Sequence, residues 1–412
     1  MEQTVEKPEK KIMLVDQNAY FASVEQQCNP ELRGKPIGVC GEGRTIIVTA
    51  SYEARWFGVK TGMTLPEARR LCPNLIPVIG NLDKYIDTSL KIHKIFLEFT
   101  NKVEVFSIDE CFLDVTETEY LFGGAVEIAK KIKKTMAEET GIKCSIGIAP
   151  NKVVAKIAAK SKKPDGLVVV GGDEVKDFMA AIPVEKLQGV GIGRKISQKL
   201  KYMGINTAKQ LGEADLGLLK SRFGILGGFY KNIGLGLSES TVKDYSGQIP
   251  IKSVGHSHTL PQDTYDIAVI RSYMLLLCEK TAARLREYKM KGRTVSMAVR
   301  FGDFDMYASR DTLKHYFNSG VEIFNLAMSI FEKVLPLQKP VRLLGVSISN
   351  LAVDDRQKYL FNDFEKKSKL LEVMDNINKK YGDFTLRPTS LITAEKYGIL
   401  GRCGIISTRL IK

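Results

Sequence analysis

Residues 12–16 of the chain read Ile-Met-Leu-Val-Asp, a short apolar run that ends in a carboxylate. Such a run predicts a buried strand with Asp16 at its C-terminal edge. Two further strand-like stretches, 103–107 and 111–115, surround the sequence Ser-Ile-Asp-Glu at 107–110, so two more acids fall in a turn between strands. These three acids are the first candidates for a functional site.

The sequence around these strands alternates between helical and strand-like patterns. Helices are expected at 82–99, 124–140 and 151–161, and a further strand at 143–148. Together with residues 12–16 they predict a split β-α-β unit of the ferredoxin-like type, interrupted by an insertion at 20–81. Within the insertion we expect a helix at 19–28, a hairpin formed by 37–40 and 45–50, and a capped helix at 64–71.

The second half of the chain repeats this pattern after a change in composition. Residues 173–238 predict short helices separated by glycines, and 239–249 form a polar, linker-like stretch. The elements expected after Pro250 are strands at 250–258, 292–301, about 305–312 and 340–349, and helices at 265–289 and 319–334. This is a second β-α-β-β-α-β unit, so the predicted fold class is α+β.

The composition limits the possible partners. The chain has 412 residues, with 61 Lys and Arg against 47 Asp and Glu, which gives a net charge of +14. This excess favours a polyanionic partner, and nucleic acid above all. No apolar run approaches the roughly 18 residues that a membrane helix needs, and Met1–Lys11 has no signal-peptide core, so we expect a cytoplasmic protein that binds no membrane.

Cysteine and histidine do not indicate a metal site. The seven cysteines include no C-x-x-C pair, which favours buried, reduced thiols over disulfides or zinc. His256 and His258 share a face of a predicted strand, but no cysteine or carboxylate joins them at ligand spacing, and we interpret them as surface residues.

The acids indicate a different kind of metal site. In a ferredoxin-like sheet, the strand that ends at Asp16 and the hairpin that carries Asp109 and Glu110 are neighbours, so the three carboxylates can converge at one edge. Clustered carboxylates repel one another unless a cation neutralises them, and oxygen ligands suit Mg²⁺. The alternative is that Asp16 is a turn residue and that Asp109 and Glu110 form an exposed hairpin tip.

Five ordered motifs resemble those of a known family. Residues 15–25 (Val-Asp-Gln-Asn-Ala-Tyr-Phe-Ala-Ser-Val-Glu) and 49–60 (Thr-Ala-Ser-Tyr-Glu-Ala-Arg-Trp-Phe-Gly-Val-Lys) are similar to the opening motifs of Y-family translesion DNA polymerases. The sequence at 107–110 resembles their S-x-D-E, and 145–152 and 162–166 continue the series in order. The likeness extends over residues 12–350 and is strongest to the bacterial polymerase IV and V branch.

The resemblance implies a right-handed polymerase with two ferredoxin-like domains. The catalytic palm would be 11–19 plus 82–172, with small fingers at 20–81 and a helical thumb at 173–238. A linker at 239–249 would lead to a little finger at 250–350, and 351–412 would form a C-terminal tail.

The resemblance also implies roles for individual residues. Asp16, Asp109 and Glu110 would be catalytic and would hold two Mg²⁺ ions, with the Gln17 carbonyl as a further ligand. The positions that match those gripping the triphosphate of the dNTP are Tyr52, Arg55 and Lys163, with Thr49 close by. Phe21 matches the steric gate, an aromatic ring that would clash with a ribose 2′-OH. Without the family, we would interpret Phe21 as a core aromatic and Arg55 as an exposed helix residue.

Three positions qualify the likeness. Asn18 replaces a second Asp found in many relatives, a residue that is not generally a direct ligand, so the metal prediction stands. Ile46 and Val48 fall where small residues often roof the nascent base pair, which suggests a lower tolerance for bulky lesions.

Residues 187–195 (Leu-Gln-Gly-Val-Gly-Ile-Gly-Arg-Lys) predict a helix-hairpin-helix turn. Glycines let the backbone approach a phosphate, and the following helix offers free N–H groups. A dinucleotide-binding motif would need a preceding strand, whereas a purely structural turn remains an alternative. The DNA contacts expected here are Gly189, Gly191, Gly193, Arg194 and Lys195.

The predicted little finger supplies a second set of DNA contacts. Lys289, Lys291, Arg293 and Arg300 cluster at a helix-to-strand junction, where they would bind phosphates independently of sequence.

The tail contains a candidate protein-binding motif. Gln357, Leu360 and Phe361 resemble the Q-x-x-L-F peptide with which bacterial polymerases dock on the sliding clamp. So short a match is also typical of an ordinary amphipathic segment. A Lys-rich helix is expected at 363–381.

Taken together, the sequence predicts a DNA-directed DNA polymerase that extends a primer with dNTPs across damaged template. We expect a monomer without a proofreading segment. Two alternatives remain, a nucleotidyl cyclase built on a ferredoxin-like sheet and a non-catalytic DNA-binding relative.

Overall fold

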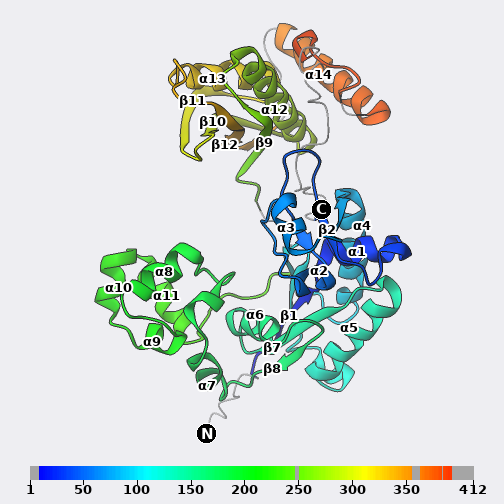
Figure 1. The fold of residues 1–412 in the computed structure, drawn as a ribbon, viewed down its shortest axis with the longest axis vertical. Helices are drawn as coiled ribbons and strands as arrows, with labels where there is room; N and C mark the ends of the chain where they lie inside the picture. Colours follow the sequence, from blue (N-terminus) through cyan, green and yellow to red (C-terminus); the bar gives the residue numbers. More distant parts are fainter. Residues whose placement is uncertain (1–8, 246–249, 355–361, 383, 392–412) are drawn as a thin grey trace. The chain divides into compact units, whose positions relative to one another are not determined.

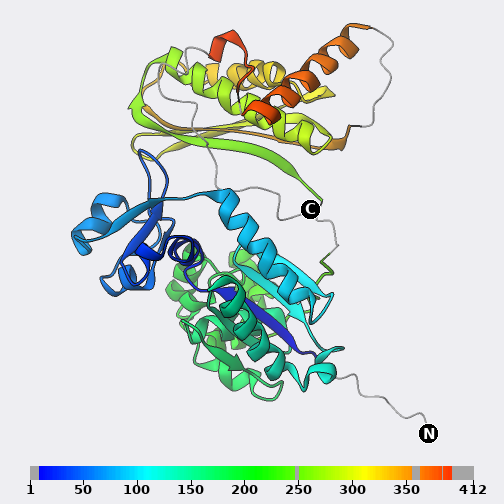
Figure 2. The same cartoon turned by 90° about the vertical axis from the view of Figure 1, so that its right-hand side faces the viewer.

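The computed structural model describes residues 9–245, 250–354, 362–382 and 384–391. They fall into two compact units, one before and one after residues 246–249, and each unit is considered by itself (Figures 1 and 2). No helix among these residues is long and apolar enough to cross a membrane.

A five-stranded sheet forms the centre of the first unit. Its order is β5 (Val103–Ser107), β6 (Glu110–Asp114), β1 (Ile12–Gln17), β7 (Cys144–Ala149) and β8 (Leu167–Val169). Every residue of β1 is buried, as its apolar run predicts. Strand β1 pairs antiparallel with β6 and β7, and Asp16 lies directly opposite Glu110. Residues opposite each other in an antiparallel pair share a face, so these two acids are neighbours.

Helices cover both faces of this sheet (Figure 2). Helices α4 (Leu82–Leu97) and α5 (Ala125–Thr140) pack on the face that Met13 and Val15 present. Helix α6 (Lys152–Ser161) packs on the opposite face, with Ile12, Leu14 and Phe112. Because side chains alternate along a strand, Asp16 and Glu110 belong to the α6 face.

Helix α6 lies very close to the sheet at Gly147. A Cβ atom at Gly147 would stand 2.2 Å from the carbonyl oxygen of Ala155 and 2.3 Å from the amide nitrogen of Ala159. The absence of a side chain at this point of β7 therefore sets the distance between helix and strand.

The insertion between β1 and α4 carries its own three-stranded sheet, ordered β3-β2-β4. Its elements are α1 (Tyr20–Cys28), the 3₁₀ turn η1 (Pro30–Leu32), β2 (Ile37–Cys40), β3 (Thr49–Ala50), α2 (Tyr52–Trp56), α3 (Leu65–Leu71) and β4 (Ile76–Ile79). The predicted hairpin is only partly correct, since the second strand is limited to β3 and the parallel partner β4 was not expected. The capping box between Thr64 and Glu67 is present as predicted.

Short helices complete the first unit after β8 (Figure 1). They are α7 (Val175–Ala180), η3 (Val184–Leu187), α8 (Arg194–Tyr202), α9 (Ala208–Glu213), α10 (Leu216–Phe223) and α11 (Leu226–Gly234), and the 3₁₀ turn η2 (Glu119–Phe122) precedes α5. Their apolar residues join those of α6 in one core.

The described part of the linker-like stretch is packed rather than free. Val242 is buried, and the backbone N–H of Lys243 donates to Glu104 at 3.0 Å. The amide of Tyr245 donates to the Asn101 carbonyl at 3.3 Å. Polar composition alone had not indicated these contacts.

The second unit is built on an antiparallel sheet ordered β11-β10-β12-β9. Its strands are β9 (Ser253–Thr264), β10 (Met290–Phe301), β11 (Met306–Phe317), β12 (Val341–Ser349) and the short β13 (Ala352–Val353). Helices α12 (Ile267–Glu287) and α13 (Gly320–Glu332) cover one face, so the β-α-β-β-α-β order agrees with the prediction. Helix α14 (Asn362–Tyr381) and η4 (Thr389–Leu391) follow, and the Arg286 guanidinium binds Asp375 with two hydrogen bonds of 2.6 and 2.7 Å.

The interpretation of two histidines as surface residues was wrong. His256 and His258 are partly buried on the helix-facing side of β9, and the His258 ring stacks on Tyr273 with centroids 5.3 Å apart. Burial lowers the pKa of His256 to about 4.

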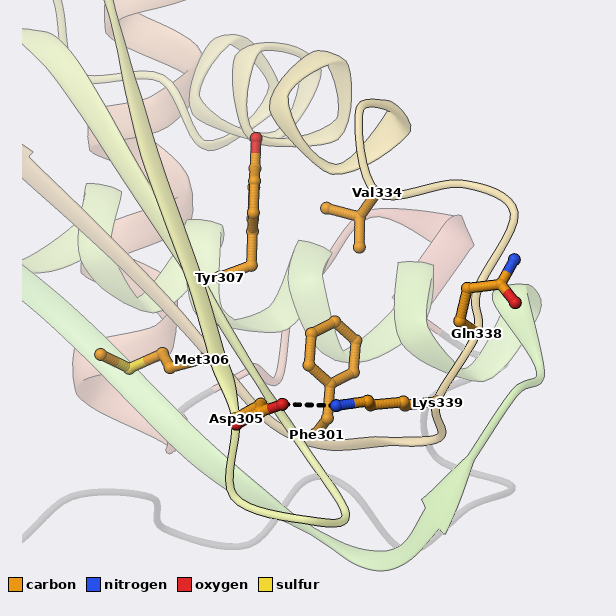
Figure 3. Close-up of a pocket in the computed structure, with 7 residues that line it drawn as sticks. All are labelled: Phe301, Asp305, Met306, Tyr307, Val334, Gln338 and Lys339. Atoms are coloured by element: carbon orange, nitrogen blue, oxygen red, sulfur yellow. Dashed lines mark hydrogen bonds and ion pairs between the residues drawn. The ribbon is translucent and has the colours of Figure 1, made fainter.

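A pocket of about 350 Å³ lies beside the β10–β11 turn of the second unit (Figure 3). It is lined by Phe301, Asp305, Met306, Tyr307, Val334, Gln338 and Lys339. The one cation in this lining, Lys339, is paired with Asp305 and with nearby Asp303. The pocket includes none of the candidate site residues.

Candidate active site

The three acids converge at one edge of the first sheet, as predicted. Asp16 is the penultimate residue of β1 and pairs with Glu110 at the start of β6, while the backbone N–H of Gln17 donates to the backbone carbonyl of Asp109 at 2.9 Å. The Ser107 hydroxyl donates to Asp109 Oδ1 at 2.6 Å. The alternative of an exposed hairpin tip is therefore wrong, because Asp16 is only 3% exposed and the other two carboxylates are partly buried beside it.

Two lysines neutralise part of this cluster. Lys163 Nζ lies 2.5 Å from Asp16 Oδ1, and Lys156 Nζ lies 2.7 Å from Glu110 Oε2. Both lysines come from α6 or the turn that follows it. The Lys156 pair joins β6 to α6, and the Lys163 pair joins β1 to the turn after α6.

The carboxylates respond differently to this environment. Burial raises the pKa of Asp16 to about 7 against the attraction of Lys163, and the charges of Glu110 and Asp109 add to the rise. Burial likewise raises the pKa of Asp109, opposed by its hydrogen bond from Ser107. Burial alone would raise the pKa of Glu110, but the ion pair with Lys156 lowers it below its usual value. The acids thus repel one another while lysines only partly compensate them.

This donor set fits a hard cation. Clustered carboxylate oxygens suit Mg²⁺, and Asp16 and Glu110 lie directly opposite each other at this edge. Among the described residues, no three His, Cys, Asp or Glu side chains are arranged so that they could hold one metal ion. Lys163 and Lys156 each contact a carboxylate oxygen of this cluster.

The residues predicted to bind the triphosphate come from β3, from α2 and from the turn after α6. Thr49 is in β3, and Tyr52 and Arg55 are in α2. The Arg55 Nε donates to the Ala50 carbonyl at 3.0 Å, and its guanidinium lies 4.8 Å from the Tyr52 ring centroid. Burial raises the pKa of Tyr52, the charge of Arg55 opposes the rise and the charge of Asp16 adds to it, so Tyr52 lies within electrostatic reach of Asp16.

Phe21 is a core aromatic of the first unit. It is 8% exposed on α1 and stacks on Tyr85 of α4, with ring centroids 4.2 Å apart. Tyr85 was not singled out from the sequence.

The glycine-rich turn forms as predicted between η3 and α8. Gly189 and Gly191 have φ values of 90° and 114°, which favour glycine. A Cβ at Gly189 would lie 2.9 Å from Lys156 Cε, and one at Gly191 would lie 2.6 Å from the Phe229 ring. These glycines therefore have structural reasons to be present. Arg194 and Lys195 are exposed in the first turn of α8, after Gly193. DNA contact by these five residues stays a prediction.

The basic residues of the second unit differ in availability. Lys289 is exposed just after α12, while Lys291 is ion-paired with Asp354 at 2.6 Å. The Arg293 guanidinium lies 5.6 Å from the Tyr316 ring centroid, and Arg300 is half-buried in β10. Their DNA contacts stay predictions, and Gln357, Leu360 and Phe361 lie outside the described residues.

Sequence reasoning missed Lys156, the lysine of α6 that pairs with Glu110, whereas Lys163 was singled out through the family resemblance. Lys156 is flanked by Val, Ala and Ile, and every residue from Val153 to Ala159 is buried. A lysine inside an otherwise apolar helix is the signal that could have indicated it.

Comparison with known proteins decides the family. Residues 15–160 match the impB/mucB/samB family, and residues 251–360 match the impB/mucB/samB family C-terminal domain. The DNA polymerase IV of Moorella thermoacetica is 37% identical over 377 residues, which span 90% of this chain and 94% of the relative. The chain belongs to the impB/mucB/samB family.

Other relatives of this family agree. DNA polymerase IV of Pelotomaculum thermopropionicum is 36% identical, covering 93% of this chain and 96% of that protein. DNA polymerase IV 1 of Bacillus subtilis is also 36% identical, covering 93% of this chain and 94% of that protein.

Solved structures support the same family. A Y-family DNA polymerase chimera of Dbh and Dpo4 is 28% identical, covers 83% of this chain and 99% of its own, and has a TM-score of 0.75. An insertion ternary complex of Dbh DNA polymerase is also 28% identical with the same coverage, at a TM-score of 0.57.

The chain is therefore a DNA-directed DNA polymerase of the Y family, with a sheet-based palm and a C-terminal little finger, and its function is translesion synthesis. The predicted α+β fold class is confirmed. Y-family polymerases act on DNA and deoxynucleotides and need a divalent metal ion. The cyclase and non-catalytic alternatives have no support among these relatives.

Proposed function

We propose that Asp16, Asp109 and Glu110 hold two Mg²⁺ ions, with the Gln17 carbonyl as a further ligand, and that this edge catalyses nucleotidyl transfer. The convergence of three buried or half-buried carboxylates at one sheet edge carries the proposal. When bound, the ions would activate the attacking oxygen and stabilise the leaving one. The primer 3′-OH would bond to the α-phosphorus of a dNTP as the α–β phosphoanhydride bond breaks, releasing pyrophosphate.

The residues of α2 and Lys163 would bind the triphosphate. Arg55 offers a forked set of donors, and its contacts with Ala50 and the Tyr52 ring hold it in place before the nucleotide arrives. Lys163 would leave Asp16 and bind a phosphate oxygen of the nucleotide. This is possible because its ammonium is a compact charge at the end of a flexible side chain. Thr49, in the neighbouring strand β3, completes this set.

Phe21 would exclude ribonucleotides. Its ring is nearly buried and supported by Tyr85, so it cannot easily move aside for a 2′-OH. We expect Phe21→Ala to admit ribonucleotides, and unchanged sugar selectivity would remove this assignment.

DNA would be held through its backbone. In the thumb, Gly189, Gly191, Gly193, Arg194 and Lys195 would contact phosphates at the start of α8, a nine-residue helix with an open N-terminus. In the little finger, Lys289, Lys291, Arg293 and Arg300 would do the same, and Lys291 would first have to leave Asp354. Such contacts should weaken steeply with salt.

A sliding clamp is the proposed protein partner. Leu360 and Phe361 would fill an apolar pocket of the clamp and Gln357 would fix the register. Unchanged clamp binding after both apolar residues are replaced by Ala would remove this proposal. We expect the polymerase to act as a monomer, in the cytoplasm with the DNA it copies.

Primer extension on a gapped template tests the active site. We expect Asp109→Asn to reduce kcat/KM by about 100-fold or more, because several kcal/mol of transition-state stabilisation depend on the metal. The control is Glu117→Gln, which removes an exposed carboxylate that pairs with Lys102. Full activity of Asp109→Asn would refute the metal assignment.

A further inference from the structure

Lys156 places a positive charge inside the palm. The residue is 3% exposed in the middle of α6, and its ammonium lies 3.8 Å from the centroid of the Phe106 ring. A buried ammonium is costly unless it is paired and hydrogen-bonded. Its ion-pair partner is Glu110, one of the acids proposed to bind metal, at 2.7 Å.

The same helix carries a second pair of similar design. One turn earlier, Lys152 Nζ lies 2.9 Å from Glu104 Oε2 and 5.5 Å from the Phe112 ring centroid. Glu104 also accepts the backbone N–H of Lys243, so this pair fastens β5, α6 and the chain after α11 together. The Lys152 pair does not involve an acid of the active-site edge, whereas the Lys156 pair does.

Lysine side chains therefore already pair with two of the three acids at this edge. Asp16 is paired with Lys163 and Glu110 with Lys156, while Asp109 accepts from Ser107. Without these partners, the repulsion among the three carboxylates would be offset much less. Any divalent ion that takes the same oxygen of Glu110 has to compete with Lys156.

The thumb limits where Lys156 can move. Lys160, one turn further along α6, donates to the Gln188 carbonyl at 3.1 Å, and a Cβ at Gly189 would stand 2.9 Å from Lys156 Cε, so the backbone of the turn passes beside this lysine. The glycine-rich turn thus closes over the lysine stem. A displaced ammonium would stay near the site and continue to weaken cation binding.

We infer that Lys156 is a built-in counter-ion of Glu110 that positions this carboxylate when no metal is bound and lowers the affinity of the edge for divalent ions. The inference rests on the proposed function of Asp16, Asp109 and Glu110 as metal ligands. It makes Lys156 a positioning residue, because it acts through Glu110 rather than on substrate.

Manganese binding to the full chain, without DNA or nucleotide, tests this. Free Mn²⁺ is counted by electron paramagnetic resonance, and melting temperature is recorded with and without Mn²⁺. Lys156→Met keeps the length of the side chain and removes its charge. We expect about ten-fold tighter Mn²⁺ binding, a difference of about 1.4 kcal/mol, a lower melting temperature without metal, and a larger rise on adding Mn²⁺.

Lys152→Met is the matched control. It should lower the melting temperature while leaving Mn²⁺ affinity at the wild-type value, because Glu104 is not part of the edge. Lys156→Arg keeps the charge and should retain wild-type affinity, and Lys156→Gln replaces Lys156→Met if the latter does not fold.

The outcomes separate this inference from the function on which it rests. Equal Mn²⁺ affinity in the wild type and in Lys156→Met, with Asp109→Asn binding more weakly, would overturn the role of Lys156 and leave the metal site intact. Wild-type binding that Asp109→Asn does not weaken would overturn both.

Discussion

The ring of Tyr85 lies flat against the ring of Phe21, with centroids 4.2 Å apart and planes 11° from parallel. Tyr85 is itself fixed at both ends, since its hydroxyl donates to Glu25 at 2.7 Å and its carbonyl accepts from the Tyr20 hydroxyl at 2.6 Å. Glu25 is in turn paired with Lys84. The proposed steric gate thus depends on a network between α1 and α4.

We predict that Tyr85→Leu weakens discrimination against ribonucleotides by up to about ten-fold, because a stacked aromatic pair contributes on the order of 0.5–1.5 kcal/mol. The measurement is the ratio of kcat/KM for a dNTP to that for the matching rNTP. Tyr85→Phe keeps the stack and should keep the ratio. If Phe21→Ala lowers the ratio and Tyr85→Leu does not, then Tyr85 only fills the core.

The sequence allowed the strands and the acidic edge to be predicted because both depend on local patterns. The apolar run at 12–16 and the strands around Asp109 and Glu110 could pair in few ways, and pairing brings the acids together. The contacts of Lys156, Tyr85 and Tyr245 could not be predicted in this way. Each depends on how closely two distant elements approach, which periodicity does not specify.

Individual misses have identifiable causes. Strand β4 contains Pro77, which weakens a strand pattern, and pairs with a strand about 40 residues earlier. The close approach of α6 to the sheet depends on Gly147, and the hydrophobic pattern of the sequence gives no signal for it because glycine has no side chain. Phe21, Tyr52, Arg55 and Lys163 received their roles only through the family resemblance.

Ile46 offers a test of lesion tolerance. Its side chain is 48% exposed, whereas that of adjacent Ile47 is fully buried. Ile46→Ala should therefore change stability by no more than about 0.5 kcal/mol, yet improve extension past a bulky template adduct. Bypass is measured relative to undamaged template. Comparable bypass by the wild type and Ile46→Ala would mean that Ile46 does not roof the nascent pair.

His93 should make the first unit sensitive to acid. It is 1% exposed between the Ser89 hydroxyl, 3.3 Å away, and the Tyr245 hydroxyl, 3.5 Å away. Burial lowers its pKa from 6.5 to about 4. The unfolded chain therefore binds the proton first, and the contribution of His93 to stability is complete above pH 6.5 and declines as the pH falls toward 4.

The loss expected from His93 is at most about 3 kcal/mol, since each pKa unit corresponds to about 1.36 kcal/mol. Hydrogen exchange of α4 peptides in the full chain between pH 7.5 and 4.5, corrected for the intrinsic rate, measures it. In His93→Gln this decline should be smaller, while His256→Gln should leave α4 unaffected. An equal decline in wild type and His93→Gln would assign the acid sensitivity to other groups.

Gly147 should be the least replaceable residue of β7. A Cβ there would meet backbone atoms of Ala155 and Ala159 at 2.2 and 2.3 Å, and backbone cannot rotate away as a side chain can. Gly147→Ala must lift α6 from the sheet, at a cost of about 1–3 kcal/mol. Urea unfolding monitored by hydrogen exchange of α6 measures this cost, and Gly193→Ala, where a Cβ meets nothing within 4 Å, is the control. The same displacement should also change the acidic edge, because α6 carries Lys156. It should lengthen the contact between Lys156 and Glu110 and raise the affinity for Mn²⁺, as we expect for Lys156→Met. A stable Gly147→Ala protein with wild-type Mn²⁺ affinity would show that the distance between helix and strand does not control the acidic edge.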